Sequence, residues 1–238
     1  SMPDSRLMLE HAIAPFLSKA NRVIFAILKD HDNSFNAGSI IRELVPNSEV
    51  VVLDKLTRGP AETVLHMIQT SKVTGAFLVK DVDSFFEPNQ AYDPSMNYVS
   101  VCNARDVRNI RLHNKSFAVI NEQGYLVGTV EKSIRSEFFS CGGYFFSDPE
   151  AFVESFSAFE GLQLGDEFFL SNVIDVMIET GHVFQPMNCV NYEDWGTHDD
   201  WINFRKRVAT YLLDIDGVIY ENGSRFGTPR WGENKVID

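Results

Sequence analysis

The sequence predicts an α/β domain in which a mixed, mostly parallel sheet is flanked by helices. In the first third of the chain, short and almost continuous apolar runs alternate with segments of helical apolar spacing. This alternation is typical of parallel strands joined by helices. The chain has 238 residues, 44% of them hydrophobic and 23% charged, a balance that indicates a globular protein. The length fits one large domain, or one domain with part of a second.

Each element of the first third follows from a local pattern. Apolar residues recur at helical spacing in residues 7–17, and a second helix is expected over 39–44, closed near Pro46. Pro60 begins a third helical segment, 60–69, and proline suits the first turn of a helix. The apolar runs that we expect to form buried strands are residues 23–28, 50–53 and 76–79.

The remainder of the chain has a different texture. Glu122-Gln123-Gly124 lies between two apolar runs and predicts a hairpin turn. Further strands are expected at 98–102, 117–121, 126–129, 138–146, 183–190 and 211–214. Helices are expected from Asp148, over 168–179 and over 201–209. Paired phenylalanines such as Phe138 and Phe139 are expected to pack on both faces of their element.

Charge and composition exclude some classes of function. The formal net charge of −12 repels phosphate backbones, so we expect no nucleic-acid partner. A small anionic ligand would need a local basic pocket or a metal. The three cysteines show no metal-ligand spacing and fit a cytoplasmic protein. No signal peptide or apolar run of about 20 residues is present, so we expect no membrane segment. The sequence is compatible with a homo-oligomer and does not indicate the oligomeric state.

Two acidic segments each follow an expected strand. Asp81 and Asp83 come directly after residues 76–79, and Asp194 follows residues 183–190. Ligands of open α/β sheets bind beyond the carboxyl ends of strands, and carboxylates there are suited to a divalent cation. The alternative is that these residues only cap polar loops. Both interpretations remain open from the pattern alone.

Seven segments, taken in order, carry a resemblance to a known family over about residues 7 to 208. They are LMLEHAI at 7–13, TRGPAETV at 57–64, KDVD at 80–83, VEK at 130–132, CGGYFF at 141–146, GDEFFL at 165–170 and EDWGT at 193–197. The series resembles the sugar-phosphate nucleotidyltransferases, which join an NTP and a sugar 1-phosphate to give an NDP-sugar and pyrophosphate. This resemblance implies a Rossmann-like, GT-A-like fold for nucleotide-diphospho-sugar transfer.

The resemblance also implies roles for particular residues. Asp81 and Lys132 would be catalytic, with Lys132 meeting the sugar phosphate, although Ser133 replaces the family's proline. Mg²⁺ would be held by Asp81, Asp83 and Asp194. Contacts with the nucleotide or NDP-sugar and the sugar phosphate would come from Arg58, Gly59, Ala61, Glu131, Gly142, Gly143, Glu167 and Thr197. Arg58 is equally well explained as a solvated loop cation.

The family's strongest motif, a strand followed by a Gly-x-Gly-x-Arg phosphate loop, does not occur before residue 7. We therefore expect weak or no nucleotidyl transfer by this chain, because one such donor is worth roughly 2.7 to 4 kcal/mol. We also expect a gap in the sheet that another segment would fill. Two alternatives remain: a GT-A-type glycosyltransferase, and a non-catalytic module that binds a sugar nucleotide.

The carboxyl end carries a second resemblance. Leu212-Leu213-Asp214-Ile215-Asp216-Gly217 resembles the opening motif of haloacid-dehalogenase-type phosphatases, in which the first aspartate attacks a phosphoryl group and the second is general acid and base. The later motifs of that family do not fit in the residues that remain. We therefore expect a nucleotidyltransferase-like domain over 1–208 and the truncated start of a phosphatase-type domain over 209–238.

Overall fold

The fold was analysed in a computed structural model of the chain, which describes residues 2, 4, 6–107, 111–162, 167–207, 220–221 and 235–236. The chain divides into two compact units, residues 1–204 and 205–238. In the second unit, β10 (Tyr220–Glu221) pairs antiparallel with β11 (Lys235–Val236). Asp214 and Asp216 lie outside the described residues, so the phosphatase-type domain stays a prediction.

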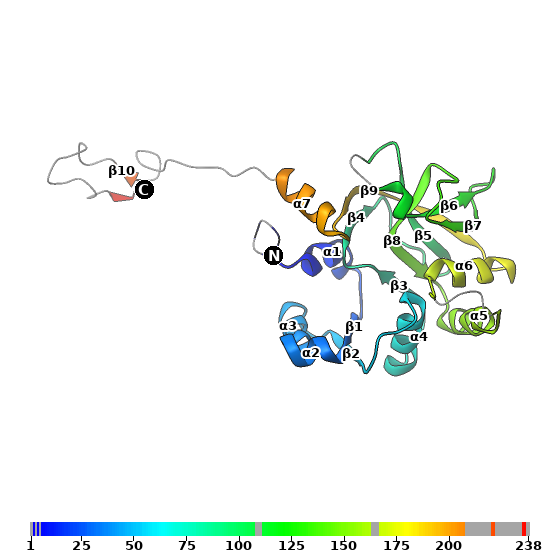
Figure 1. Cartoon of the computed structure of the whole chain (residues 1–238), viewed down its shortest axis with the longest axis horizontal. Coiled ribbons are helices and arrows are strands. Elements are labelled where there is room, and N and C mark those ends of the chain that lie inside the picture. Colours follow the sequence, from blue (N-terminus) through cyan, green and yellow to red (C-terminus); the bar gives the residue numbers. More distant parts are fainter. Residues whose placement is uncertain are drawn as a thin grey trace. The chain divides into compact units, whose positions relative to one another are not determined.

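The first unit begins with the predicted alternation of strands and helices (Figure 1). Its elements are α1 (Met8–Leu17), β1 (Ile24–Leu28), α2 (Lys29–Phe35), α3 (Ala37–Leu44), β2 (Glu49–Leu53), α4 (Pro60–Ser71) and β3 (Phe77–Lys80). Only α2 was not predicted. It buries none of its residues and has no apolar repeat that would reveal a helix in the sequence.

The strand expected over 211–214 lies outside the described residues. The middle and later elements include two that were not predicted, at residues 84–88 and 112–114, and otherwise follow the expected order. They are β4 (Ser84–Pro88), β5 (Asn97–Asn103), the 3₁₀-helix η1 (Leu112–Asn114), β6 (Ser116–Ile120), β7 (Leu126–Glu131), β8 (Phe138–Phe146), α5 (Pro149–Leu162), α6 (Leu170–Glu179), β9 (Phe184–Asp194) and α7 (His198–Arg207). The predicted hairpin between β6 and β7 is confirmed: Gly124, with φ of 86°, donates its N–H to the Asn121 carbonyl at 3.0 Å.

The sheet is mixed, and the prediction of a mostly parallel sheet is wrong for the described strands. Only β1–β2 and β5–β9 pair in parallel. The main sheet runs β3-β8-β5-β9-β7-β6, with β4 added beside β9. A further β6–β8 contact closes five of these strands into a barrel-like ring. Helices separate β8 from β9, whereas β5 to β8 follow one another without an α-helix, a connectivity that allows antiparallel neighbours.

Two apolar cores lie on the opposite faces of β5 and β8. On one face, Phe146, Phe152 and Phe184 are fully buried together with apolar residues of α4, α5 and α6. Burying one such side chain contributes roughly 1.5 to 3 kcal/mol. Phe138 packs against this core and Phe139 belongs to the other, so the expected division of the phenylalanine pair between two faces is confirmed.

The strands nearest the amino terminus keep open edges within the described part of the chain. There, β1 pairs only with β2, and β3 pairs only with β8, so these neighbours in the predicted order belong to separate sheets. Helix α4 contacts both β1 and β2 and also contributes to the core against Phe146. The described β1 and β3 are thus not paired with each other, and the gap expected from the sequence stays a prediction.

Candidate functional site

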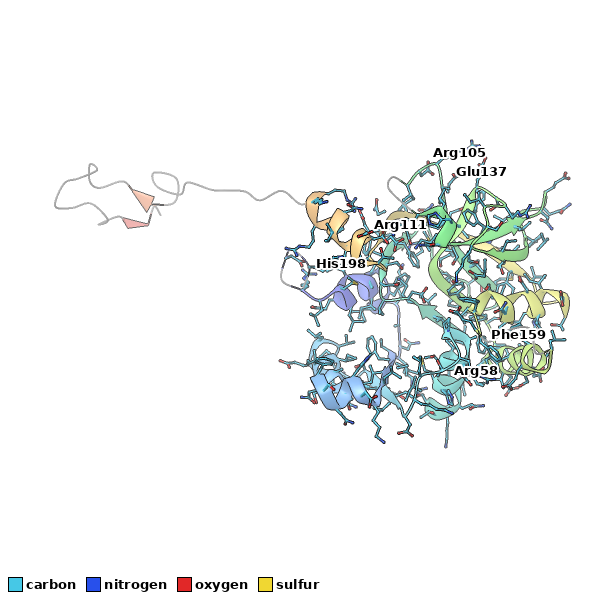
Figure 2. The ribbon with its side chains drawn as sticks, viewed as in Figure 1. Arg58, Arg105, Arg111, Glu137, Phe159 and His198 are labelled. Carbon is cyan, nitrogen blue, oxygen red and sulfur yellow. The ribbon has the colours of Figure 1, made fainter. Side chains whose placement is uncertain are left out.

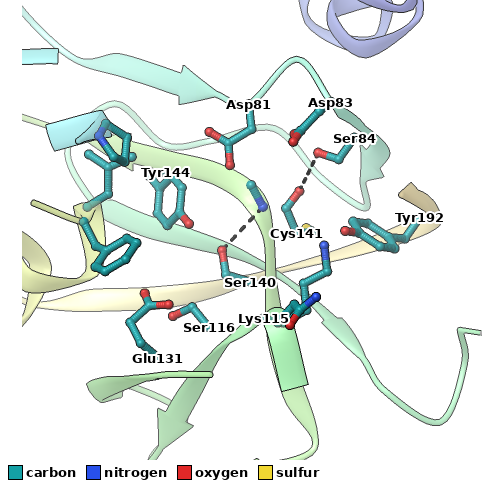
Figure 3. A pocket seen from close by; sticks show the side chains of 15 residues that line it. Asp81, Asp83, Ser84, Lys115, Ser116, Glu131, Ser140, Cys141, Tyr144 and Tyr192 are labelled. Atoms are coloured by element: carbon teal, nitrogen blue, oxygen red, sulfur yellow. Dashed lines mark hydrogen bonds between the residues drawn. The ribbon is translucent and has the colours of Figure 1, made fainter. Parts of the chain in front are cut away.

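A cavity of about 190 Å³ opens where β3 ends, and its wall is mainly polar (Figure 3). The predicted residues Asp81, Asp83, Glu131 and Gly142 all line it. The other lining residues are Pro60, Ser84, Asn114, Lys115, Ser116, Ser140, Cys141, Tyr144, Phe169, Leu170 and Tyr192. Carboxylates, hydroxyls and an ammonium group therefore face one small space, as binding of a polar, charged ligand requires.

Asp81 lies where β3 ends and packs directly against β8. Its N–H donates to the Gly142 carbonyl at 2.9 Å, and a Cβ on Gly142 would lie 2.7 Å from Asp81 Oδ2. Gly142 also has a φ of 83°, which disfavours any residue with a side chain. Burial, with a further contribution from the charge of Asp83, raises the pKa of Asp81 to about 6.

The turn that carries Asp81 and Asp83 is fastened by a neighbouring lysine. Lys80 Nζ donates to the Asp81 carbonyl, and to the carbonyl and hydroxyl of Ser84 at 2.8 and 3.0 Å. The same ammonium lies 4.8 Å from the centre of the Phe86 ring. Burial lowers the pKa of Lys80 to about 8. Lys80 therefore fixes the turn that carries Asp81 and Asp83 through its bonds to the Asp81 carbonyl and to Ser84, and it does not itself line the cavity.

Asp194 comes from the end of β9 and is held by a lysine that the sequence did not reveal. Lys115 Nζ lies 2.6 Å from Asp194 Oδ2 and 5.5 Å from the centre of the Tyr192 ring. Asp83 lies beside this pair, because the position of a Cβ on Gly196 would be within 3.4 Å of carboxylate oxygens from both Asp83 and Asp194. The three predicted metal-binding aspartates thus lie at one side of the fold, with Lys115 among them.

Lys132 and Glu131 lie at the open end of the β6–β7 hairpin. Lys132 donates its N–H to the Lys115 carbonyl at 3.0 Å, and its ammonium lies 5.1 Å from the centre of the Phe169 ring. Glu131 accepts a hydrogen bond of 2.5 Å from Ser171. Since Glu131 and Phe169 both line the cavity, Lys132 is positioned at its rim.

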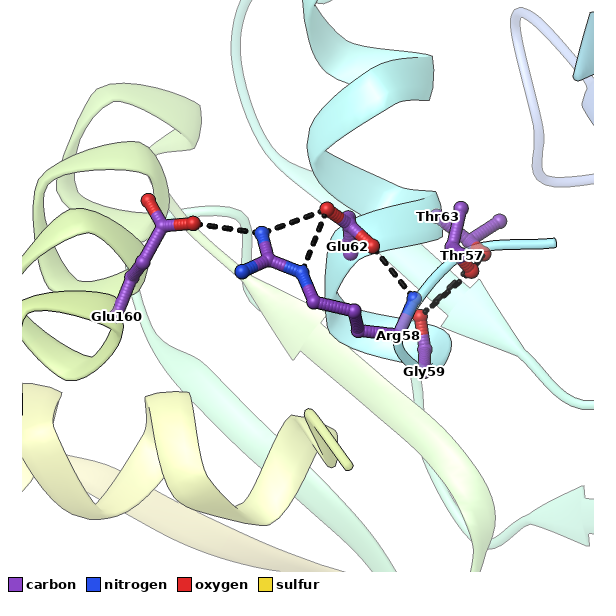
Figure 4. Close-up of polar contacts among 6 residues, drawn as sticks. All are labelled: Thr57, Arg58, Gly59, Glu62, Thr63 and Glu160. Atoms are coloured by element: carbon purple, nitrogen blue, oxygen red, sulfur yellow. Dashed lines mark hydrogen bonds and ion pairs between the residues drawn. The ribbon is translucent and has the colours of Figure 1, made fainter. Parts of the chain in front are cut away.

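In the loop of residues 58–61, Pro60 lines the cavity, whereas Arg58, Gly59 and Ala61 do not. Figures 2 and 4 show the position of Arg58 in this loop. Arg58 Nη2 lies 2.6 Å from carboxylate oxygens of both Glu62 and Glu160. The guanidinium also stacks over the Phe168 ring. These carboxylates raise the pKa of Arg58. The described contacts of Arg58 are therefore those of an ion-pair network that joins α4 to α5.

Backbone packing explains the two small residues of this loop. A Cβ on Gly59 would lie 2.5 Å from the Phe168 carbonyl, while Ala61, which is completely buried, donates its N–H to that carbonyl at 3.0 Å. Gly143 has an equivalent role in β8, because its own Cβ would lie 2.4 Å from the Phe86 ring. These glycines permit close packing around the site.

Thr197 and Glu167 also lie outside the cavity lining. Thr197 precedes α7, and its hydroxyl accepts the Asp200 N–H at 3.2 Å and donates to the Asp200 carboxylate. This is the pattern of a helix N-cap. Glu167 is exposed. The structure thus gives Thr197 a capping contact and leaves Glu167 at the surface.

The predicted carboxylates suit magnesium chemically. Mg²⁺ prefers oxygen ligands and is commonly bound by one or two carboxylates together with substrate phosphates. Asp81 and Asp83 face the cavity and supply such oxygens. Among the described residues, no three His, Cys, Asp or Glu side chains are arranged to hold a metal ion by themselves. The two carboxylates therefore fit a Mg²⁺ ion whose remaining ligands come from a phosphate group of the substrate.

Known proteins with the same fold were found among solved structures. The nucleoside-diphosphate-sugar pyrophosphorylase from Vibrio cholerae RC9 superposes with a TM-score of 0.71 at 20% identity, over 85% of this chain and 88% of that chain. The inositol-1-phosphate CTP transferase from T. maritima gives a TM-score of 0.68 at 14% identity, over 84% of this chain and 80% of that one. The chain has a nucleotidyltransferase-like fold.

Sequence comparisons add no family. No protein-family model matches the chain, and no curated protein matches its sequence. In the described residues, no helix has the length and apolar character needed to cross a membrane. At these low identities the structural likeness shows the fold, so a function has to be argued from the cavity itself.

Proposed function

We propose that this chain is a nucleotidyltransferase-like protein of sugar-nucleotide synthesis, in the cytoplasmic production of precursors for surface or capsular polysaccharides. The reaction that we assign to the site is NTP plus sugar 1-phosphate to NDP-sugar plus pyrophosphate, and we expect this chain to catalyse it weakly or not at all. The observation that carries the proposal is the convergence of Asp81, Asp83 and Lys115 on one cavity, with Lys132 at its rim, in this fold. The two structural neighbours, a nucleoside-diphosphate-sugar pyrophosphorylase and an inositol-1-phosphate CTP transferase, support it.

The residues of the cavity suit this chemistry. A phosphate oxygen of the sugar 1-phosphate attacks the α-phosphorus of the NTP, the bond from that phosphorus to the bridging oxygen breaks, and pyrophosphate leaves. Asp81 and Asp83 would hold Mg²⁺, which offsets negative charge on the phosphoryl oxygens when bound. Lys132 would orient the attacking phosphate by charge and hydrogen bonding. Glu131 and Tyr144 would contact the sugar hydroxyls from the cavity wall.

A second candidate is a non-catalytic module that binds a sugar nucleotide. The favouring observation is the engagement of Arg58 with Glu62 and Glu160, which leaves its guanidinium turned toward carboxylates rather than toward the cavity. Such a module would bind the NDP-sugar without releasing pyrophosphate. The glycosyltransferase alternative predicts transfer of sugar to an acceptor, again without pyrophosphate.

Ligand binding tests the proposal directly, because a ligand that binds the native state raises its melting temperature. NTPs, NDP-sugars and sugar 1-phosphates should be screened by thermal shift with and without Mg²⁺. We expect a Mg²⁺-dependent shift with one nucleotide or NDP-sugar. No shift with any of these ligands, in protein that unfolds cooperatively, would contradict the proposal.

A substitution at the rim of the cavity tests the phosphate assignment. Lys132→Ala should weaken sugar 1-phosphate binding by about tenfold or more, because it removes a charge-assisted hydrogen bond. Lys29→Ala is the matched control, since Lys29 forms an exposed ion pair with Asp54 at 2.8 Å. Equal sugar 1-phosphate affinity in both variants would remove Lys132 from the site.

A further inference from the structure

The ion pair of Lys115 and Asp194 differs from the others in its burial. The Lys115 side chain is 18% exposed and that of Asp194 is 15% exposed. In the exposed pair of Lys29 and Asp54, the corresponding values are 56% and 84%. A charged pair with so little access to water is screened weakly, and separating it without replacement partners is costly. The pair is therefore a persistent feature of the site and needs an explanation.

The position of the Lys115 ammonium supplies that explanation. Asp194 was predicted to complete a magnesium site with Asp81 and Asp83, and carboxylate oxygens of Asp83 and Asp194 do lie close to the same point beside Gly196. Asp194 nevertheless directs Oδ2 to Lys115 at 2.6 Å. Lys115 thus supplies the positive charge that a bound cation would otherwise bring to Asp194.

We propose that Lys115 is an exchangeable counter-ion of the site: its ammonium holds Asp194 until a divalent cation binds, and it then exchanges Asp194 for a phosphate oxygen of the ligand. The phosphate half of the inference rests on the proposed function. The cation half depends on Lys115 and the three aspartates, and not on a nucleotide or sugar ligand.

Geometry permits this exchange. Lys115 lines the cavity, and its ammonium is carried on a flexible four-carbon stem, so it can leave Asp194 without a change in the backbone. Its carbonyl accepts the Lys132 N–H at 3.0 Å, which places the two lysines at the same end of the β6–β7 hairpin. A phosphate in the cavity would then be approached by both ammonium groups, which is a favourable arrangement for a doubly charged anion.

The first measurement is Mn²⁺ binding, by calorimetry and by electron paramagnetic resonance, without nucleotide or sugar. Lys115→Met removes the competing charge, so we expect Mn²⁺ to bind roughly tenfold more tightly, the factor that corresponds to one charge-assisted hydrogen bond. Lys115→Arg keeps the charge and should bind Mn²⁺ like the wild type. Lys29→Met breaks an exposed ion pair elsewhere and should have no effect.

The second measurement adds inorganic pyrophosphate to protein saturated with Mn²⁺. Lys115→Met should now bind pyrophosphate about tenfold more weakly than wild type, because the released ammonium is missing. Opposite signs in the two titrations distinguish exchange from general damage to the site, which would weaken both. If Lys115→Met does not fold, as judged by circular dichroism, Lys115→Gln replaces it in both titrations.

Each other result overturns the inference. Unchanged or weaker Mn²⁺ binding by the neutral variant, or no Mn²⁺ binding by either protein, refutes the counter-ion role. Tighter Mn²⁺ binding with unchanged pyrophosphate affinity refutes the exchange. If both titrations follow expectation while no nucleotide or sugar phosphate binds, the proposed function fails and the role of Lys115 stands.

Discussion

The buried carboxyl of Asp81 should lower the stability of the protein at neutral pH. Burial and the charge of Asp83 raise its pKa from 3.8 to about 6. The folded chain therefore holds this proton more tightly than the unfolded chain, and stability falls as pH rises from about 4 to about 6. A difference of about two pKa units corresponds to about 3 kcal/mol, lost in full above that window. Asp81→Asn keeps the shape of the side chain and removes the charge.

We therefore expect Asp81→Asn to be more stable than wild type by about 2 to 3 kcal/mol at pH 7, and equally stable near pH 4. Urea unfolding at about four pH values between these limits, without divalent cations, measures the difference. Asp175→Asn is the necessary control, because burial also raises the pKa of Asp175 to about 6, and its titration overlaps that of Asp81.

Two results would refute this reasoning. An Asp81→Asn variant that is less stable than wild type at pH 7 would mean that the ionised carboxylate is stabilised by its surroundings. A stability difference that does not change between about pH 4 and pH 7 would mean that Asp81 does not titrate there. Adding Mg²⁺ at pH 7 should reduce or reverse the stability advantage of Asp81→Asn, because only the wild type gains stability by binding the ion through Asp81.

Three further substitutions test the packing behind the site, each by urea unfolding. Gly142→Ala should destabilise the fold by at least 1 kcal/mol more than Gly124→Ala. Both positions have a positive φ, but only the new Cβ at Gly142 would meet Asp81. Equal losses of stability in the two variants would contradict this contact. Thr197→Ala should cost about 1 kcal/mol through loss of the α7 cap, while Thr197→Ser should cost little. Phe146→Ala should cost about 3 to 5 kcal/mol, and a loss below 1 kcal/mol would contradict its central place in the core.

Patterns within single segments made much of the fold predictable. The apolar runs of β1, β2 and β3 and the helical spacing of α4 and α6 are local signals, and all five of these elements are present. Strand direction is not local. It depends on which strands become neighbours, and β8 inserts antiparallel between β3 and β5, a pairing that no short pattern in the sequence contains.

In the candidate site too, local patterns reveal some residues, whereas others depend on long-range contacts. Asp81 and Asp83 could be placed from sequence because an acidic pair at the end of a buried strand faces the ligand edge of such sheets. Lys115 could not, since it belongs to no motif and reaches Asp194 only through folding of residues 79 positions apart. The 3₁₀-helix that ends directly before Lys115 was also not predicted, and three residues give too short a pattern to recognise.

The engagement of Arg58 likewise depends on long-range contacts. Its partner Glu160 lies on α5, far along the chain, so the sequence alone left both interpretations of this arginine open. The structure shows the ion-pair network, whereas a nucleotide contact stays a prediction.

The central claim is that the cavity at the end of β3 binds a sugar nucleotide through a divalent cation. Calorimetric titration of the ligand selected by the thermal-shift screen, into wild type and Asp81→Asn, with Mg²⁺ or with EDTA, tests it most directly. The account predicts that the wild type binds the ligand in Mg²⁺ but not in EDTA. It also predicts that the affinity of Asp81→Asn in Mg²⁺ is at least tenfold lower. Equal affinity in all four titrations would contradict it.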